Sequence, residues 1–212
     1  MSKSVLITRP NHDLTTTYLS AWARKIAEIA QEKGFFIYDL EGVRANVKTF
    51  LSFLKEKSPS FLFLNGHGSP SEICGQRNEV IMDSTTEIPG AIIYARSCSA
   101  GIRLGEEAIK NGARAFIGYA RNFIVGYSPD KVFEPLTDDM ASLFLDPSNL
   151  VASVIIKGHS AAEANTRSKE AMYKNFRKMI LSTATYEERY ASQWLWSNLK
   201  GQILLGDPDA KI

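Results

Sequence analysis

In FLFLNGHGS (residues 61–69) and in AIIYARSCSAG (residues 91–101), an apolar run leads directly into a reactive side chain. A continuous apolar run is typical of a buried strand in a parallel sheet, and ligands bind beyond the carboxyl ends of such strands. His67 follows the first run and Cys98 follows the second, so we expect both at one edge of a sheet. An imidazole beside a thiol is the minimum requirement for thiolate catalysis, because the thiolate is the attacking species.

Strand and helix patterns alternate through the rest of the chain. Short apolar runs predict strands at residues 5–8, 35–40, 61–64, 91–95, 113–118 and 202–205. Apolar residues at helical spacing predict helices at residues 14–32, 43–57, 100–110, 132–145 and 161–181. Residues 151–156 fit either a strand or the start of a helix, and residues 69–89 fit an irregular loop or a small hairpin. This alternation predicts an α/β fold with a mainly parallel sheet and helices on both faces.

Composition limits the classes of protein to consider. The chain has 212 residues, 44% of them hydrophobic, which suits one domain spanning residues 1–212. A net charge of +2 from 25 basic and 23 acidic residues gives no basic stripe for nucleic acid. The first apolar run is too short for a signal peptide and no segment approaches membrane-spanning length, so we expect a soluble, cytoplasmic protein without a membrane partner.

Cysteine and histidine usage predicts neither a disulfide nor a metal. Cys74 and Cys98 are expected to stay reduced in the cytoplasm, with Cys74 in a passive packing role. The three histidines are widely spread in the sequence, without the spacing of a metal site, and His12 is expected in solvent. We therefore expect no metal and no cofactor.

The residues around His67 and Cys98 suit catalysis at a strand end. Gly66 and Gly68 are expected to leave room for a substrate backbone, and the N–H groups of Gly68 and Cys98 to form an oxyanion hole. The helix predicted after Cys98 is expected to favour the thiolate through its amino-terminal partial charge.

Aromatic residues follow the predicted strand at residues 113–118. In the loop at residues 119–135, Phe123, Tyr127 and Phe133 are expected to lie over the same sheet edge and line a groove. Later in the chain, four aromatic residues are expected to pack on the core: Tyr186, Tyr190, Trp194 and Trp196.

Five short motifs, in order, resemble those of the caspase-like cysteine peptidases, a clan that includes caspases, metacaspases, gingipains, legumains, separases and bacterial CHAT domains. The two at the predicted site are NGHGS (residues 65–69) and RSCSAG (residues 96–101). The other three look most like the gingipain and CHAT branch: GARAFIG (residues 112–118), GHSAAEA (residues 158–164) and LGDP (residues 205–208). The resemblance implies a three-layer caspase-like sandwich over nearly the whole chain.

The resemblance also implies roles for individual residues. Cys98 would attack the peptide carbonyl, His67 would protonate the leaving amine, and no third catalytic residue is required. Arg96, two residues before the nucleophile, would border the pocket for the side chain preceding the cut bond, together with the stretch from Arg9 to Asp13. Arg96 would favour an acidic or polar substrate side chain, whereas Asp13 would favour lysine or arginine.

Three functions fit these residues. The leading hypothesis is a cysteine endopeptidase acting on a protein or peptide substrate. A catalytically silent module that binds a peptide in the same fold is the second. A cysteine-dependent amidotransferase or other hydrolase is the least favoured, because the chain lacks a Gly-x-Cys-x-Gly elbow and its histidine precedes its cysteine. The sequence leaves open whether a partner protein, calcium or processing activates the chain, and its oligomeric state.

Overall fold

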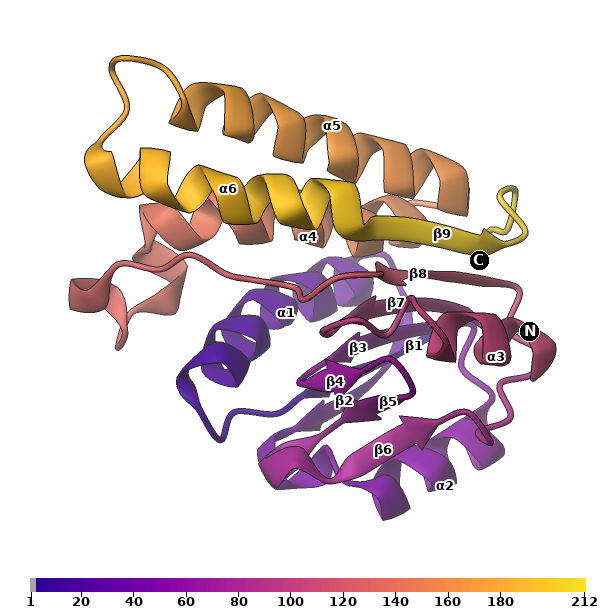
Figure 1. Cartoon of the computed structure of the whole chain (residues 1–212). Coiled ribbons are helices and arrows are strands. Elements are labelled where there is room, and N and C mark those ends of the chain that lie inside the picture. Colours follow the sequence, from indigo (N-terminus) through magenta and orange to yellow (C-terminus); the bar gives the residue numbers. More distant parts are fainter. Residues whose placement is uncertain (1–2) are drawn as a thin grey trace.

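The computed structural model describes residues 3–212 and has three layers, with a central sheet between two layers of helices (Figure 1). The six strands of this sheet lie in the order β2-β1-β3-β7-β8-β9. Their bounds are β1 Ser4–Arg9, β2 Phe36–Glu41, β3 Phe61–Asn65, β7 Ile92–Arg96, β8 Ala115–Tyr119 and β9 Gln202–Gly206. Only β9 runs antiparallel to its neighbour, which confirms the predicted mainly parallel sheet.

Helices cover both faces of the sheet, as predicted. One face packs against α1 (Leu14–Glu32), α4 (Asp139–Ile156), α5 (Ala161–Met179) and α6 (Tyr186–Gly201), and the other against α2 (Val47–Lys57) and α3 (Leu104–Lys110). Successive strand residues point to opposite faces, so Val5 and Ile7 enter the first core whereas Leu6 enters the second. The strands read as continuous apolar runs because both faces are buried.

A second, smaller sheet fills the segment between β3 and β7. It contains β4 (Gly68–Ser69), β5 (Glu72–Cys74) and β6 (Val80–Asp83) in that order, with antiparallel pairing. Of the two readings of residues 69–89, the structure therefore supports the hairpin. Four short 3₁₀ helices lie in the described connections: η1 Gly42–Arg44, η2 Gln76–Asn78, η3 Pro129–Lys131 and η4 Pro135–Thr137.

The helix predicted at residues 132–145 is wrong in its start. Pro129 and Pro135 open separate 3₁₀ turns, and the α-helix begins only after Asp138, whose side chain accepts a hydrogen bond from Ala141 N–H at 3.0 Å. The same helix, α4, continues through residues 151–156, which settles that segment as helix rather than strand.

The expectation that no segment approaches membrane-spanning length also needs correction. Among the described residues, α4 is long and apolar enough to cross a membrane by length and composition alone. Most of it is buried inside the fold, as is common for the core helix of a globular domain.

Candidate active site

His67 and Cys98 lie on loops that leave the sheet side by side. Strands β3 and β7 pair in parallel, and their last residues, Asn65 and Arg96, are register partners. His67 and Cys98 each follow two residues later. A Cβ added at Gly68 would lie 3.0 Å from the side chain of Ser97, so the two loops are in van der Waals contact.

Asp13 holds the imidazole of His67. Its Oδ2 lies 2.6 Å from His67 Nε2, while its Oδ1 accepts a hydrogen bond from Thr16 N–H as the N-cap of α1. Burial would raise the pKa of Asp13, but the hydrogen bonds from Thr16 and His67 outweigh it and lower the pKa to about 2. An ionised carboxylate at Nε2 favours the tautomer with its proton there, which leaves Nδ1 with the free lone pair.

This position of Asp13 corrects its predicted role. The sequence places Asp13 as an acid beside a substrate pocket, whereas the structure places its carboxylate on the imidazole. Asp13 follows β1, and β1 pairs with β3, the strand that ends just before His67. The contact therefore depends on the order of the strands in the sheet. The loops after the neighbouring strands β1 and β3 leave the sheet at the same edge.

The thiol of Cys98 is half-buried, and its Sγ donates a weak hydrogen bond to Phe123 O at 3.7 Å. Burial raises the pKa of Cys98, and the hydrogen bond to Phe123 offsets only part of that increase. The predicted lowering of this pKa by a helix is wrong, because residues 100–103 form a turn and α3 begins only at Leu104.

Strand β8 and the residues after it hold the loop that carries Cys98. Ser99 N–H donates to Arg121 O and Gly101 N–H to Tyr119 O, both at 2.9 Å. Ser99 has a positive φ of 57°, which turns the chain sharply just after the thiol. Across the described residues 3–212, the N–H of Cys98 donates no hydrogen bond to the protein.

The glycines beside His67 make room for the protein itself. At Gly66, where φ is +147°, an added Cβ would lie 2.1 Å from the carbonyl oxygen of Cys74. At Gly68, it would lie 2.9 Å from the carbonyl oxygen of Glu72. These glycines allow the His67 loop to pack closely on the small sheet, instead of leaving space for a substrate backbone as predicted.

Replacing Gly66 with alanine is expected to lower the free energy of unfolding by about 2 kcal/mol or more, because strain and a backbone clash add together. Urea unfolding followed by circular dichroism measures the change. Gly90→Ala is the matched control, since Gly90 also has a positive φ, +77°, but nothing lies within 4 Å of an added Cβ. Gly90→Ala should lower the free energy of unfolding through backbone strain alone, by about 1 kcal/mol. Equal losses in the two variants would contradict the clash.

Arg96 does not border a pocket, contrary to the prediction. Its side chain is fully buried, and its guanidinium donates to Asn65 Oδ1 at 2.8 Å, Asn149 Oδ1 at 2.9 Å and Leu19 O at 2.8 Å. It also lies over the ring of Phe63, 5.0 Å from the centroid. The residue shares a strand face with Tyr94 and points into the core beneath α1 and α4, so it is a structural residue.

Arg9 is likewise buried, with 2% of its surface exposed. Its Nη2 pairs with Asp39 at 2.6 Å and with Glu41 at 2.7 Å, and both acids belong to the neighbouring strand β2. The prediction that Arg9 faces a substrate is therefore wrong, because its buried guanidinium already forms ion pairs with these two carboxylates.

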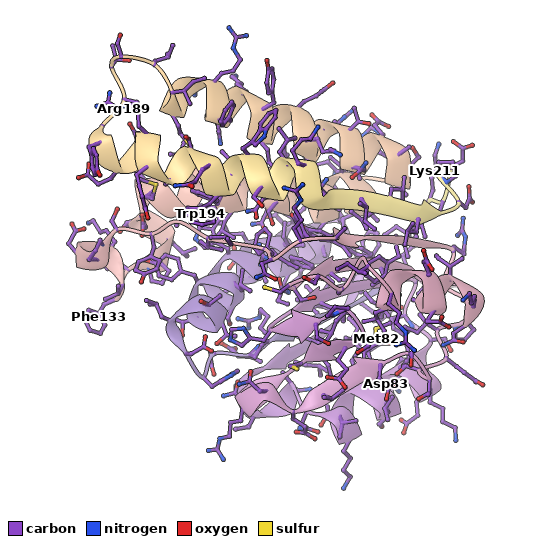
Figure 2. All side chains as sticks on the ribbon, viewed as in Figure 1. Met82, Asp83, Phe133, Arg189, Trp194 and Lys211 are labelled. Carbon is purple, nitrogen blue, oxygen red and sulfur yellow. The ribbon has the colours of Figure 1, made fainter. Side chains whose placement is uncertain are left out.

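The aromatic residues expected to line a groove divide into two groups. Phe123 is buried and packs on Tyr119 at 4.6 Å between ring centroids, and Tyr127 packs on Tyr18 at 5.7 Å. Phe133 is 95% exposed and extends from its loop into solvent (Figure 2). Phe123 therefore belongs to the core, and its carbonyl oxygen accepts the hydrogen bond of Cys98 Sγ, whereas Phe133 is exposed.

On α6, the aromatic residues expected to pack on the core keep between 38% and 71% of their surface exposed, and Figure 2 labels one of them, Trp194. The helix buries Leu195 and Leu199 instead.

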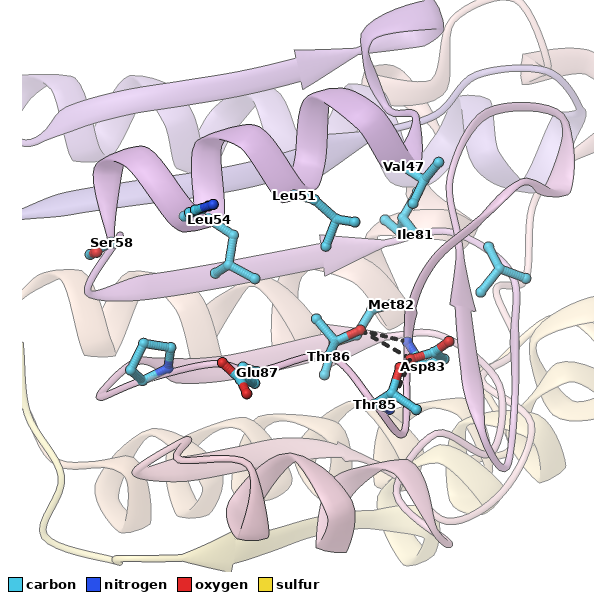
Figure 3. A pocket seen from close by; sticks show the side chains of 13 residues that line it. Val47, Leu51, Leu54, Ser58, Ile81, Met82, Asp83, Thr85, Thr86 and Glu87 are labelled. Carbon is cyan, nitrogen blue, oxygen red and sulfur yellow. Dashed lines mark hydrogen bonds between the residues drawn. The ribbon is translucent and has the colours of Figure 1, made fainter.

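A groove lies elsewhere on the molecule, between α2 and β6 (Figure 3). It has a volume of about 580 Å³ and an apolar floor that includes Leu51, Leu54, Ile81 and Met82. None of its lining residues belongs to the His67 and Cys98 loops.

Two of the three histidines meet at the site, which corrects the expectation that they are too widely spread for a metal. The rings of His12 and His67 lie 5.9 Å apart between centroids, with Asp13 contacting both. His12 is not in solvent as expected, because only 14% of its side chain is exposed.

The fold and the adjoining histidine and cysteine loops define a caspase-like α/β architecture. Gingipain R, described as an Arg-specific cysteine proteinase, superposes with a TM-score of 0.61 at 12% identity, over 99% of this chain and 47% of that one. A complex of RgpB pro- and mature domains from Porphyromonas gingivalis gives the same score and identity over 98% and 47%. A third structure, described as a protease, gives 0.51 at 15% identity over 99% and 48%.

This chain therefore spans about half the length of the solved structures that it matches. No family model and no curated protein sequence matches it. At these identities, the similarity establishes the caspase-like fold and not the chemistry.

Proposed function

We propose that this chain is a cysteine peptidase in which Cys98 is the nucleophile and His67 is the general acid and base. One observation carries the proposal: both residues follow register partners, Asn65 and Arg96, at the ends of neighbouring parallel strands. The fold shared with gingipain R supports it. Endopeptidase activity, the kinship with the CHAT branch and the cytoplasmic location are finer parts of the same proposal.

The proton transfers follow from the hydrogen bonds of His67. Asp13 occupies Nε2, so Nδ1 accepts the proton of the Cys98 thiol. Because the pKa of Cys98 is raised, this transfer accompanies attack on the substrate carbonyl instead of preceding it as a stable ion pair. The sulfur then bonds to the carbonyl carbon, Nδ1–H protonates the leaving amine, and water later hydrolyses the thioester.

The oxyanion of the tetrahedral intermediate needs donors beside Cys98. The Cys98 N–H makes no hydrogen bond to the protein within residues 3–212, and Gly68 lies against the adjacent Ser97. We assign these two N–H groups to the oxyanion, as the sequence predicts. No metal or cofactor takes part in this mechanism.

Digestion of a peptide library tests the proposal. The wild-type chain should cleave library members, and both Cys98→Ala and His67→Ala should reduce cleavage by about 10³-fold or more. Cys74→Ala is the matched control because Cys74 is also a half-buried free thiol with a raised pKa, and it should cleave at the wild-type rate. Cleavage that survives Cys98→Ala would overturn the assignment of the nucleophile.

A second candidate is a peptide-binding module that has the same fold without the chemistry. The raised pKa of Cys98 and the burial of Arg96, which leaves no charged pocket at that position, favour it. In that case the folded wild-type chain would retain library peptides without cleaving them, and Cys98→Ala would retain them equally well. The same library therefore separates the two candidates.

A further inference from the structure

We propose that His12, Asp13 and His67 form a site for a zinc ion, and that zinc bound there blocks the general base. The ligand atoms of the three side chains all lie within 4.8 Å of one another. Two imidazoles and one carboxylate are a ligand set typical of zinc with an open fourth position. His12 has no part in the mechanism proposed above, so the catalytic site alone does not account for its position.

The geometry needs only small side-chain movements to hold zinc. Ligand atoms at about 2.0–2.1 Å from a tetrahedral zinc ion lie roughly 3.3 Å apart. Asp13 Oδ2 is 3.6 Å from His12 Nε2 and 2.6 Å from His67 Nε2. The first distance is already near the required value, and the second must lengthen as the ion replaces the hydrogen bond.

The surroundings favour a metal over a simple hydrogen-bonded cluster. Asp13 supplies a carboxylate oxygen, Oδ2, that contacts both imidazoles. His12 Nε2 also lies 3.2 Å from Asn78 Oδ1, a neutral partner that zinc can displace. The two imidazoles favour zinc over calcium, which takes oxygen ligands.

Zinc at this site would prevent His67 from acting as a general base, because it fixes the tautomer of the imidazole. A neutral imidazole has one N–H and one lone pair. When Nε2 gives its lone pair to zinc, the ring proton must sit on Nδ1, the nitrogen that would accept the thiol proton of Cys98. The zinc-bound imidazole therefore has no basic nitrogen left. This inhibitory effect rests on the proposed peptidase function, whereas the binding of zinc does not.

Zinc binding to the intact chain is measured by competition with a chromophoric chelator and by the imidazole NMR signals. The chain has only three histidines, so zinc should shift the signals of His12 and His67 and leave those of His159 in place. His12→Ala should weaken zinc binding by about 100-fold or more, since even residues that only support metal ligands contribute 10–100-fold. His159→Ala is the matched control because His159 pairs with Glu163 elsewhere, and it should bind zinc like the wild type.

Cys98→Ala separates this inference from the proposed function. It should bind zinc as tightly as the wild type although it cannot cleave peptides. Loss of binding in Cys98→Ala would show that the thiol holds the ion, and unchanged binding in folded His12→Ala would show that His12 does not; either result overturns the site. If His12→Ala fails to fold, His12→Asn and the wild-type NMR shifts decide. Calcium should produce no shift.

The inhibition is tested on an active wild-type chain. Zinc should stop cleavage reversibly, with full recovery on adding chelator, and His12→Ala should need about 100-fold more zinc for the same inhibition. Equal zinc sensitivity of the two proteins would remove the inhibitory role even if binding is confirmed.

Discussion

Arg96→Ala is expected to lower the free energy of unfolding by about 3–5 kcal/mol, the largest stability change of any single substitution considered for this chain. Arg96 is fully buried, and its guanidinium joins β7 to β3 through Asn65, to α1 through Leu19 and to α4 through Asn149. Alanine removes all three hydrogen bonds, leaves the side-chain oxygens of Asn65 and Asn149 without this donor, and opens a cavity between the sheet and two helices. Urea unfolding measured by circular dichroism and fluorescence gives the change.

A volume-conserving variant separates the contributions. Arg96→Met fills much of the same space but donates no hydrogen bonds, so it should lose less than Arg96→Ala, about 1–3 kcal/mol. Among residues 3–212, no carboxylate faces the guanidinium, and its burial lowers the pKa of Arg96 to about 10, so removing the charge recovers part of the loss. Lys110→Ala, which removes an exposed ion pair with Glu107, should change stability by less than about 1 kcal/mol. If Arg96→Ala also lowered the free energy of unfolding by less than about 1 kcal/mol, the structural role of Arg96 would be contradicted.

The sequence predicts the elements whose signals are local. The helix expected at residues 14–32 is α1, Leu14–Glu32, because its regular apolar face and the glycine that follows it, Gly34, both lie within one segment. The common edge of His67 and Cys98 follows from two buried parallel strands. Both inferences need only the period of the pattern and the rule for ligand sites in parallel sheets.

The sequence does not show which layer a side chain at a strand end enters. Arg96 directly precedes the active-site loop in the sequence, yet strand alternation points it to the same side as Tyr94, into the core under α1 and α4. A charged residue there is stable only because distant segments supply acceptors, and no local pattern reveals them.

The partners of His67 depend in the same way on the order of the strands. Asp13 and His12 lie 54 and 55 residues before it, and β1 brings them there by pairing directly with β3. Without that order, a lone aspartate before a helix has the pattern of an ordinary N-cap, which Asp13 also is. Its contact with the imidazole is therefore a finding of the structure.

Asp13→Asn is expected to lower kcat by about 100-fold or more with little change in KM, provided that the chain is a peptidase. Asparagine can donate a hydrogen bond to Nε2 of His67, which favours the tautomer with its proton on Nδ1, the wrong nitrogen for accepting the thiol proton. Asp13 does not touch the substrate in this scheme, so it is a positioning residue. Steady-state kinetics on a peptide selected from the library measures the effect.

Asparagine is the informative replacement because Asp13 has two roles that it separates. Asparagine caps a helix about as well as aspartate, so α1 should keep its start and the stability should change by less than about 1 kcal/mol. Asn46→Asp is the matched control: Asn46 caps α2 through Thr49 N–H at 2.9 Å without contacting His67, and the exchange should leave kcat unchanged. If Asp13→Asn keeps the wild-type kcat, Asp13 acts only as a helix cap. If kcat falls while stability is unchanged, the lost rate is due to the orientation of His67.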